Sequence, residues 1–463
     1  MRIPPRVETQ EREEREGRMK KFTANLFRIA IIAAVAGISA FCARCCYVSF
    51  FTEHSFSFRL SLIFTIVFFC GPLAYFALLS VLRYCFYREA APPGDAQLPF
   101  CTVIVPAYNE GAHVAKTIES LLESDYPADK FEIIAVDDGS IDDTRRWIRQ
   151  AAETAPKQVK VIFFNGNRGK RAALDAGFAA ARGRILVTVD SDSLVEKSTL
   201  RRIVAPLVED PEIGAVSGSV LVGNADAGVL PAFFETCFTF SFDFIRCAQS
   251  VLHGVVCTPG AISAYRRTVV DKVREAWVAQ TFMGHKSGIG EDRALTNMIL
   301  EQGYGVVMQR SARISTNVPE TYSALAKTLL RWERGNVREN LRMYLFIFKD
   351  FRWNDLRRWF LLLTLLIYTE TMLLPAVMIW ASFYYLIVTH GGLLLGILAM
   401  ALLWATLPAL VNLQHRSTRV LCRCYLYGIF YALTLFWLLP YAVLTVNDSR
   451  WMTRRHANSA GKC

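Results

Sequence analysis

The stretch Phe131-Glu-Ile-Ile-Ala-Val-Asp-Asp-Gly-Ser140 decides the fold of this chain. A short, mostly apolar run with β-branched residues ends in two acids, a glycine and a serine, which is typical of a buried strand followed by a polar turn. The same pattern recurs at Val103-Ile-Val-Pro-Ala-Tyr-Asn-Glu110 and at Ile185-Leu-Val-Thr-Val-Asp-Ser-Asp192. The chain therefore predicts several buried strands that each end in polar side chains.

Helix-like segments separate these strands. Residues 112–123, 142–152 and 170–181 show helical periodicity, and they alternate with the apolar runs. This alternation predicts a Rossmann-like α/β domain with a parallel sheet, whose ligands lie at the carboxyl ends of the strands. We expect strands at residues 101–106, 131–136, 159–164, 185–189 and 215–222.

Apolar segments flank this domain on both sides. The stretches 22–51 and 58–82 are each long enough to cross the ~30 Å hydrocarbon layer of a membrane. Their linker, residues 52–57, has no Lys or Arg, so the positive-inside rule places the domain that follows in the cytoplasm. The net charge of +11 fits this rule. Basic and aromatic residues do not interleave, so nucleic acid is not an expected partner.

The chain is accordingly divided into six parts, all as expectations. They are a cytoplasmic tail at 1–21, two transmembrane helices at 22–83, a catalytic domain at 84–321, amphipathic interface helices at 322–358, transmembrane helices at 359–446 and a cytoplasmic tail at 447–463. Three apolar stretches in 359–446 would leave the basic tail outside, against the positive-inside rule. An even number of spans would remove the conflict, and the expected location is the plasma membrane.

The polar strand ends suit a nucleotide. Aspartates after the strand at 131–136 can accept hydrogen bonds from the N–H of uracil or from ribose hydroxyls. The basic loop Asn167-Arg-Gly-Lys-Arg-Ala172 opens a helix whose N–H groups, with Lys170, can meet a pyrophosphate. The alternatives are a helix cap for the acids and a solvated turn for the loop.

Asp190 and Asp192 are candidate metal ligands. They stand one residue apart at a strand tip, where side chains two apart point the same way. Two carboxylates beside a diphosphate suit Mg²⁺ or Mn²⁺. An ordinary acidic turn is the alternative interpretation.

Two further motifs precede the C-terminal apolar region. Gly290-Glu-Asp-Arg293 contains acids suited to a general base that deprotonates an acceptor hydroxyl, although a helix-cap acid is the alternative. Leu330-Arg-Trp-Glu-Arg334 combines a phosphate-binding guanidinium with a flat ring for a sugar, although an interfacial aromatic belt has the same composition.

Together and in this order, these motifs resemble the processive inverting family 2 glycosyltransferases of GT-A fold. The likeness is greatest to hyaluronan synthases and to rhizobial chitooligosaccharide synthases, and it extends over residues 60–455. The resemblance implies a membrane-integrated hexosyltransferase that polymerises sugar from UDP-N-acetylglucosamine, with UDP-glucuronic acid as a possible second donor, and passes the growing polysaccharide through its own helices. The alternative is a non-processive transfer of one sugar to a lipid.

The resemblance also implies residue roles. The catalytic base is Asp292, with Glu291 beside it, and the metal ligand is Asp192 with Asp190. The expected donor-binding residues are Tyr108, Glu110, Asp138, Lys170, Asp190, Arg331, Trp451 and Arg454. The expected acceptor-binding residues are Trp332, Gly260 and Arg293.

Two positions depart from the family pattern. Thr328 replaces the glutamine of the QxxRW motif, and Met452 replaces the glycine of the WGTR gating motif. Both motifs serve the pyrophosphate or the acceptor, so these departures bear on donor choice and processivity more than on the reaction type.

Overall fold

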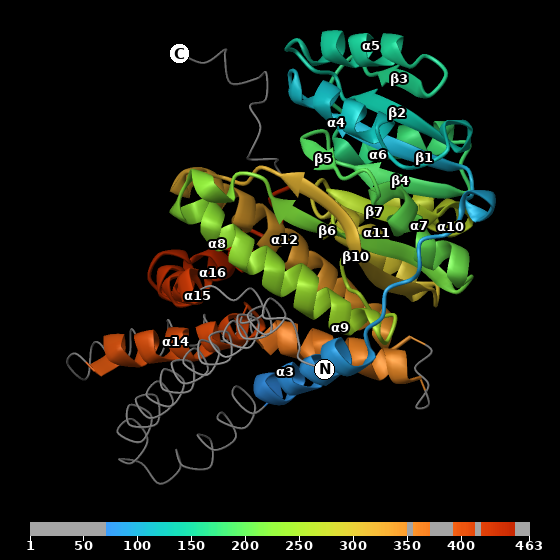
Figure 1. Cartoon of the computed structure of the whole chain (residues 1–463). Helices are drawn as coiled ribbons and strands as arrows, with labels where there is room; N and C mark the ends of the chain where they lie inside the picture. The colour runs from blue at the N-terminus through green and yellow to red at the C-terminus, as the bar shows by residue number, and fades with distance from the viewer. Residues whose placement is uncertain (1–70, 350–354, 371–391, 413–417, 450–463) are drawn as a thin grey trace, which may run out of the picture. The chain divides into compact units, whose positions relative to one another are not determined.

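The computed structural model describes residues 71–349, 355–370, 392–412 and 418–449 (Figure 1). The chain divides into two compact units. One comprises residues 70–376 with 437–463 and contains the sheet, and the other comprises residues 1–69 with 377–436. The expected spans at 22–51 and most of 58–82 therefore lie outside the described residues.

The first half of the sheet is parallel, as predicted. It contains β1 (Cys101–Ala107), β2 (Phe131–Asp137), β3 (Val159–Phe163) and β4 (Ile185–Val189). They are connected by α4 (His113–Leu122), α5 (Thr144–Thr154) and α6 (Lys170–Ala180). Their order in the sheet is β3-β2-β1-β4, so the connection through α6 runs in the opposite direction from the two before it. Ligands of such sheets bind where the strand order reverses, here beside β1.

The second half of the sheet corrects the expectation of a parallel sheet. β7 (Ile262–Arg266) lies antiparallel between β4 and β6 (Ile213–Val222). Beyond β6 follow β10 (Gly305–Thr316), which is parallel to β6, and β5 (Ser193–Val195), which is antiparallel to β10. The sheet is therefore mixed, with the order β3-β2-β1-β4-β7-β6-β10-β5.

Helices and one hairpin complete this unit (Figure 1). The longer helices are α3 (Gly71–Val81), α7 (Thr199–Glu209), α8 (Val229–Phe238), α10 (Arg267–Val278), α11 (Glu291–Glu301) and α12 (Tyr322–Ile347). The π-helical segments are η2 (Leu82–Phe86) and η6 (Thr239–Arg246). The short elements are η3 (Asp95–Gln97), η4 (Ala128–Lys130), η5 (Ala225–Ala227), α9 (Cys247–Ser250), the strands β8 (Thr281–Phe282) and β9 (His285–Lys286), and α16 (Leu438–Leu444).

The central strands are buried along their whole length. Every residue of β1, β2 and β4 is buried, which explains why their sequences are nearly continuous apolar runs. β2 contains two buried acids, Asp137 at its end and Glu132 within it, and the carboxylate of Glu132 is satisfied by Thr102, Lys160 and Arg182. The three partners keep the pKa of Glu132 lowered although burial opposes its ionisation.

The second unit contains α14 (Gly392–Asn412), α15 (Thr418–Phe430) and η8 (Tyr431–Leu435). Among the helices that the structure describes, no single one is both long and apolar enough to cross a membrane. The helices Arg419–Leu435 and Leu438–Leu444, separated by a short break, reach that length and composition together. This pair agrees with the expected span at 425–446, whereas the number of spans stays a prediction.

Candidate active site

The polar residues predicted at the strand ends do meet at one edge of the sheet. Because β1 pairs with β2 and with β4 in parallel, the segments that begin at Tyr108, Asp138 and Asp190 leave the same edge. Tyr108 and Asp138 are buried, and Asp190 is half-buried. The structure thus assembles the expected donor-side residues at the point where the strand order reverses.

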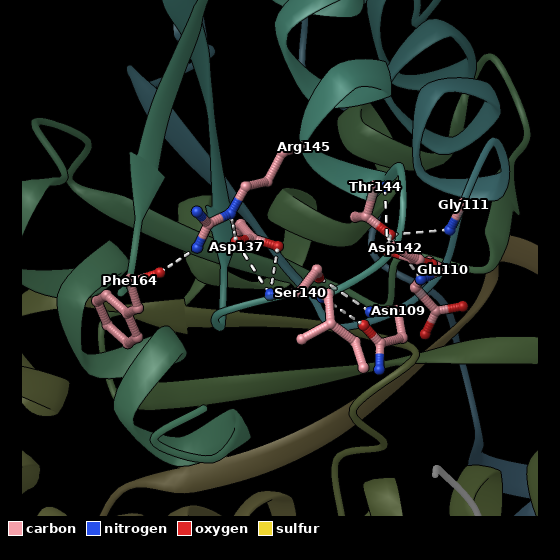
Figure 2. Close-up of polar contacts among 10 residues, drawn as sticks. Asn109, Glu110, Gly111, Asp137, Ser140, Asp142, Thr144, Arg145 and Phe164 are labelled. Carbon is pink, nitrogen blue, oxygen red and sulfur yellow. Dashed lines mark hydrogen bonds and ion pairs between the residues drawn. The ribbon is translucent and has the colours of Figure 1, made fainter. Parts of the chain in front are cut away.

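Side-chain hydrogen bonds join the loops after β1 and β2 (Figure 2). The amide of Asn109 donates to Ser140 Oγ, and the amide of Ile141 donates back to Asn109 Oδ1, at 3.0 Å each. The amides of Glu110 and Gly111 both donate to Thr144 Oγ1, at 2.8 and 2.9 Å. These bonds fix the backbone of Glu110, a predicted donor residue.

The two acids at the end of β2 have different roles. The Asp137 carboxylate is 2.7 Å from Arg145 Nε and also accepts from the amide of Ser140, so it holds the turn together (Figure 2). Asp138 instead accepts from the amides of Arg168 and Gly169, at 2.7 and 2.8 Å. Burial raises the pKa of Asp138, and the two amides oppose that shift. Each ionised oxygen retains a further acceptor position for a ligand donor.

Gly139 allows this close approach. Its φ is +76°, and a Cβ at this position would lie 2.3 Å from the carbonyl carbon of Gly166. A side chain would therefore push the loop at 166–169 away from Asp138, and with it the start of the helix that carries Lys170.

Lys170 links three of the sequence motifs. Its ammonium is 2.5 Å from Asp190 Oδ1 and 3.2 Å from Glu291 Oε1. Burial opposes a charge on Lys170, yet the two carboxylates outweigh it and raise its pKa. Burial also opposes ionisation of Glu291, and the charges of Lys170 and Arg331 reverse that effect and lower its pKa. Both pKa shifts favour the charged forms of Lys170 and Glu291.

Asp292 lies at the start of α11, beside this cluster. Its Oδ2 accepts from the amide of Gly260 at 3.3 Å, and its Oδ1 accepts from the amide of Arg293. Burial raises the pKa of Asp292, and the neighbouring Glu291 carboxylate raises it further. A raised pKa strengthens a carboxylate as a base, provided that the pH keeps it ionised.

Gly260 brings the loop at 257–261 to the same place. A Cβ on Gly260 would lie 2.6 Å from Lys170 Nζ, so a side chain here would displace the ammonium from its present position. Thr258 anchors this loop, because its hydroxyl is hydrogen-bonded to the hydroxyls of Tyr265 and Thr296. The predicted acceptor residue Gly260 thus touches both Lys170 and Asp292.

Asp190 and Asp192 have the donor chemistry for a divalent cation. Both belong to the tight turn between β4 and β5; Asp190 keeps one oxygen outside its ion pair with Lys170, and Asp192 is exposed. Among the described residues, no group of three or more His, Cys, Asp or Glu side chains could hold a metal. Two carboxylates fit an ion that takes its remaining ligands from water and from substrate phosphates.

The helix α12 presents Arg331 and Trp332. Arg331 is half-buried, and its charge acts on both Glu291 and Asp292. Trp332 is 38% exposed and contacts Phe234 and Phe238 of α8. Arg331 therefore lies toward Glu291 and Asp292, whereas Trp332 packs against α8.

Arg293 occupies a different position from the other predicted acceptor residues. Its guanidinium is buried and donates to Asn336 and Asn340 of α12. This placement favours a role in holding α11 against α12 over direct contact with a sugar.

Sequence reasoning missed the buried arginines Arg334 and Arg338. Arg334 donates to Thr445 and forms an ion pair with Asp448 at 3.2 Å. Arg338 donates to the carbonyl of Val446 and to Ser449. The sequence feature that could have identified Arg334 and Arg338 is their four-residue spacing, about one helical turn, directly after the Arg-Trp pair. Trp451 and Arg454, which follow the anchored segment, lie outside the described residues.

Comparisons with known proteins fit this site. A protein family described as "Glycosyltransferase like family 2" matches residues 99–335, just over half of the chain. An N-acetylglucosaminyltransferase of Rhizobium meliloti is 30% identical over 251 residues, which cover 54% of this chain and 58% of that protein. The chain thus spans less than two thirds of this relative's length. An N-acetylglucosaminyltransferase of Azorhizobium caulinodans is 27% identical over 366 residues, or 77% of this chain and 87% of that protein.

A solved structure shares the fold. A mannosyltransferase from Pyrobaculum calidifontis, in complex with GDP-Man and Mn²⁺, aligns with a TM-score of 0.53 at 20% identity. The alignment covers 84% of this chain and 97% of that one. The α/β domain therefore has the GT-A-like glycosyltransferase fold, and by the family match over residues 99–335 this chain belongs to the family 2 glycosyltransferases.

Proposed function

We propose that this glycosyltransferase transfers N-acetylglucosamine from UDP-N-acetylglucosamine to the hydroxyl of a growing saccharide, with inversion at the anomeric carbon. One observation carries the proposal: Asp292, with its raised pKa, lies beside Gly260 and the Lys170–Glu291 ion pair at the ligand-binding edge of the sheet. The names of the rhizobial relatives support the choice of sugar.

The donor half of the site supports binding of a nucleotide diphosphate. Tyr108, Glu110 and Asp138 surround the edge where a nucleoside would lie, and Lys170 and Arg331 supply positive charge for the phosphates. Asp190 and Asp192 would hold Mg²⁺ or Mn²⁺, which would neutralise charge on the departing diphosphate. The Mn²⁺ of the Pyrobaculum mannosyltransferase complex is in line with that assignment.

The transfer step uses Asp292 as the base. The acceptor hydroxyl oxygen bonds to the anomeric carbon while the bond from that carbon to the β-phosphate oxygen breaks, and UDP leaves. The hydroxyl proton passes to the Asp292 carboxylate. Attack on the face opposite the leaving group inverts the anomeric configuration. Glu291 pairs with Lys170 and so keeps that ammonium in place.

Polymerisation and passage of the product across the plasma membrane extend this proposal. Trp332 offers a ring face that contacts a sugar without requiring one hydroxyl pattern, which suits a chain that must slide. The apolar helix pair in 419–444 and the apolar sequences at both ends support a multi-pass protein with a cytoplasmic catalytic domain.

The test is incubation of the purified full chain with UDP-N-acetylglucosamine, with UDP-glucuronic acid, and with both, followed by digestion with chitinase or hyaluronidase. We expect chitinase-sensitive product from the first donor alone. Product that requires both donors and yields only to hyaluronidase would overturn the choice of a single sugar. Transfer to extracted lipid alone would replace polymerisation with single transfer, and the Asp292→Asn variant serves as the inactive control.

A further inference from the structure

A stripe of four side chains runs along the helix at 229–250, which comprises α8, η6 and α9. Phe234, Phe238, Phe242 and Arg246 recur every four residues and contact one another in sequence. The rings of Phe234 and Phe238 are 5.7 Å apart, and those of Phe238 and Phe242 are 5.6 Å apart, both edge to face. The Arg246 guanidinium lies 4.2 Å from the Phe242 ring centre. We name this set the aromatic stripe.

The π-helical segment keeps the stripe straight. Side chains four residues apart are rotated slightly past one full turn of an α-helix, which has ~3.6 residues per turn. In a π-helix, whose hydrogen bonds join residues five apart, the turn is wider, and side chains four residues apart do not complete one turn. The change from α8 to η6 after Phe238 therefore reverses the drift that a four-residue repeat would otherwise accumulate. π-helical segments inside α-helices are frequent at functional sites.

Each end of the aromatic stripe touches a different part of the acceptor side. At one end, the Trp332 ring is edge-on to Phe234 at 6.1 Å and lies 6.5 Å from Phe238. At the other end, Arg246 Nε donates to the carbonyl of Cys257 at 3.1 Å. Cys257 begins the loop whose Gly260 amide contacts Asp292 at 3.3 Å.

We propose that the aromatic stripe is a positioning element, which sets the Trp332 ring and the loop at 257–261 relative to each other and so fixes the acceptor sugar. The proposal rests on the acceptor site of the proposed function. A half-exposed Trp has two faces and a rotatable χ1, and stacking demands one of its orientations. Phe234 is 4% exposed and Phe238 is half-buried, so the Trp332 ring packs against side chains that neighbouring residues hold in place.

The donor residues reach this set of contacts at the far end of the loop at 257–261, where a Cβ on Gly260 would lie 2.6 Å from Lys170 Nζ and the amide of Asp190 donates to the carbonyl of Ala261. Asp138 is held by the loop at 166–169, and Lys170 also pairs with Glu291 at the start of α11. Phe238 lies at the opposite end of the aromatic stripe, against Trp332. A change at Phe238 should therefore alter acceptor binding and leave donor binding intact.

The experiment replaces Phe238, which touches both Trp332 and Phe242, in the full-length protein. Phe238→Leu should raise the KM for an added N-acetylglucosamine oligosaccharide about three- to tenfold, the loss expected for an aromatic pair, and shorten the product. The KM for UDP-N-acetylglucosamine and the rate of donor hydrolysis should stay within about twofold of wild type. Phe238→Tyr, which keeps the ring, should behave as wild type.

Phe240→Leu is the matched control. Phe240 lies two residues further along, in η6, and stacks on Phe244 at 5.6 Å, so this variant loses an aromatic contact on the same helix that does not involve Trp332. If Phe238→Leu and Phe240→Leu change the acceptor KM equally, or if Phe238→Leu changes the donor KM instead, the positioning role is overturned.

A second readout needs no activity. In protein labelled with 5-fluorotryptophan, the ¹⁹F resonance that disappears in Trp332→Phe belongs to Trp332. Phe238→Leu should shift this resonance, whereas Phe240→Leu should not. An unshifted resonance would overturn the proposal even if the wild-type protein transfers N-acetylglucosamine. If Phe238→Leu shifts the Trp332 resonance but the wild-type protein does not transfer N-acetylglucosamine, the proposed function is rejected, while the positioning of Trp332 by Phe238 is supported.

Discussion

Gly290 and Gly335 bring the start of α11 into backbone contact with the middle of α12. A Cβ on Gly290 would lie 3.2 Å from the Cα of Gly335, and a Cβ on Gly335 would lie 3.3 Å from the Cα of Gly290. Gly290 directly precedes Glu291 and Asp292, and Gly335 lies one turn after Arg331 and Trp332. The absence of two side chains therefore sets the distance between Asp292, the proposed base, and the Arg331–Trp332 pair.

Gly335→Ala should separate these two groups by a few tenths of an ångström. Alanine is favourable within a helix, so the thermal stability should change little. Misplacement of reacting groups is costly, and we expect kcat to fall about three- to tenfold while UDP affinity is retained. Transfer assays and thermal unfolding of the purified variant test this. A variant with wild-type kcat would show that the site tolerates the added methyl group.

Asp292→Asn should abolish transfer and leave UDP binding nearly unchanged. Loss of a general base costs about 10²–10⁴-fold in rate, and in the proposed mechanism Asp292 acts on the acceptor, not on the nucleotide. Calorimetry with UDP and single-turnover transfer measure the two effects separately. An asparagine variant that still elongates product, or one that no longer binds UDP, would contradict the assignment.

The pH dependence of kcat should report the Asp292–Glu291 pair. Because the pKa of Asp292 is raised, activity should fall as the pH drops through a value above that of an ordinary aspartate. Glu291→Gln removes the neighbouring negative charge and lowers that pKa. The acid limb of the pH profile of kcat should then move to lower pH. If the limb does not move, Asp292 is not the group whose protonation limits the rate.

Metal removal should stop the reaction. If Asp190 and Asp192 hold a divalent cation against the diphosphate, a chelator should abolish transfer, and Mg²⁺ or Mn²⁺ should restore it. Asp192→Asn should resemble the chelated enzyme at low metal concentration and recover in part at high concentration. Full activity in excess chelator would rule out the metal.

Trp332 and Arg331 should separate polymer formation from donor binding. Trp332→Ala should lose long product but retain UDP binding, because we propose that the ring contacts the acceptor. Arg331→Ala should weaken UDP binding about ten- to a hundredfold, as expected when a charge-assisted hydrogen bond is lost. Calorimetry with UDP and product length on gels distinguish the two variants. Long polymer from Trp332→Ala would leave this residue a membrane-interface anchor.

The parts of the fold that a local pattern determines could be predicted from sequence. β1 to β4 and β6 lie within two residues of the expected positions, because each is an apolar run closed by polar residues. β10 was missed because most of it, Gln309-Arg-Ser-Ala-Arg-Ile-Ser-Thr316, is predominantly polar and its pairing with β6 shifts register between Met308 and Arg313. β7 was missed as a strand because serine and arginine interrupt its short sequence, Ile262-Ser-Ala-Tyr-Arg266, so that it forms no apolar run.

The residues of the site also fall into two groups, those that a local motif predicted and those that it did not. The motifs identified Lys170, Asp190, Glu291 and Asp292 as residues of one site, and the ion pairs of Lys170 join three of these motifs. The contacts of Arg334 and Arg338 join residues more than a hundred positions apart. No local pattern in the sequence specifies such partners.

The place of β7 has a consequence for how the protein is made. The strands β3-β2-β1-β4 and β6-β10-β5 are joined only through β7, which the ribosome delivers after six of the other strands. Until residues 262–266 emerge, β4 has an unpaired edge that can bind other extended chains. The nucleotide half of the enzyme can thus form early during synthesis, and the loop at 257–261 joins it only when β7 inserts. A nascent chain arrested before residue 262 would have the strands β1 to β4 with an exposed edge at β4, but neither Asp292 nor the Arg331–Trp332 pair.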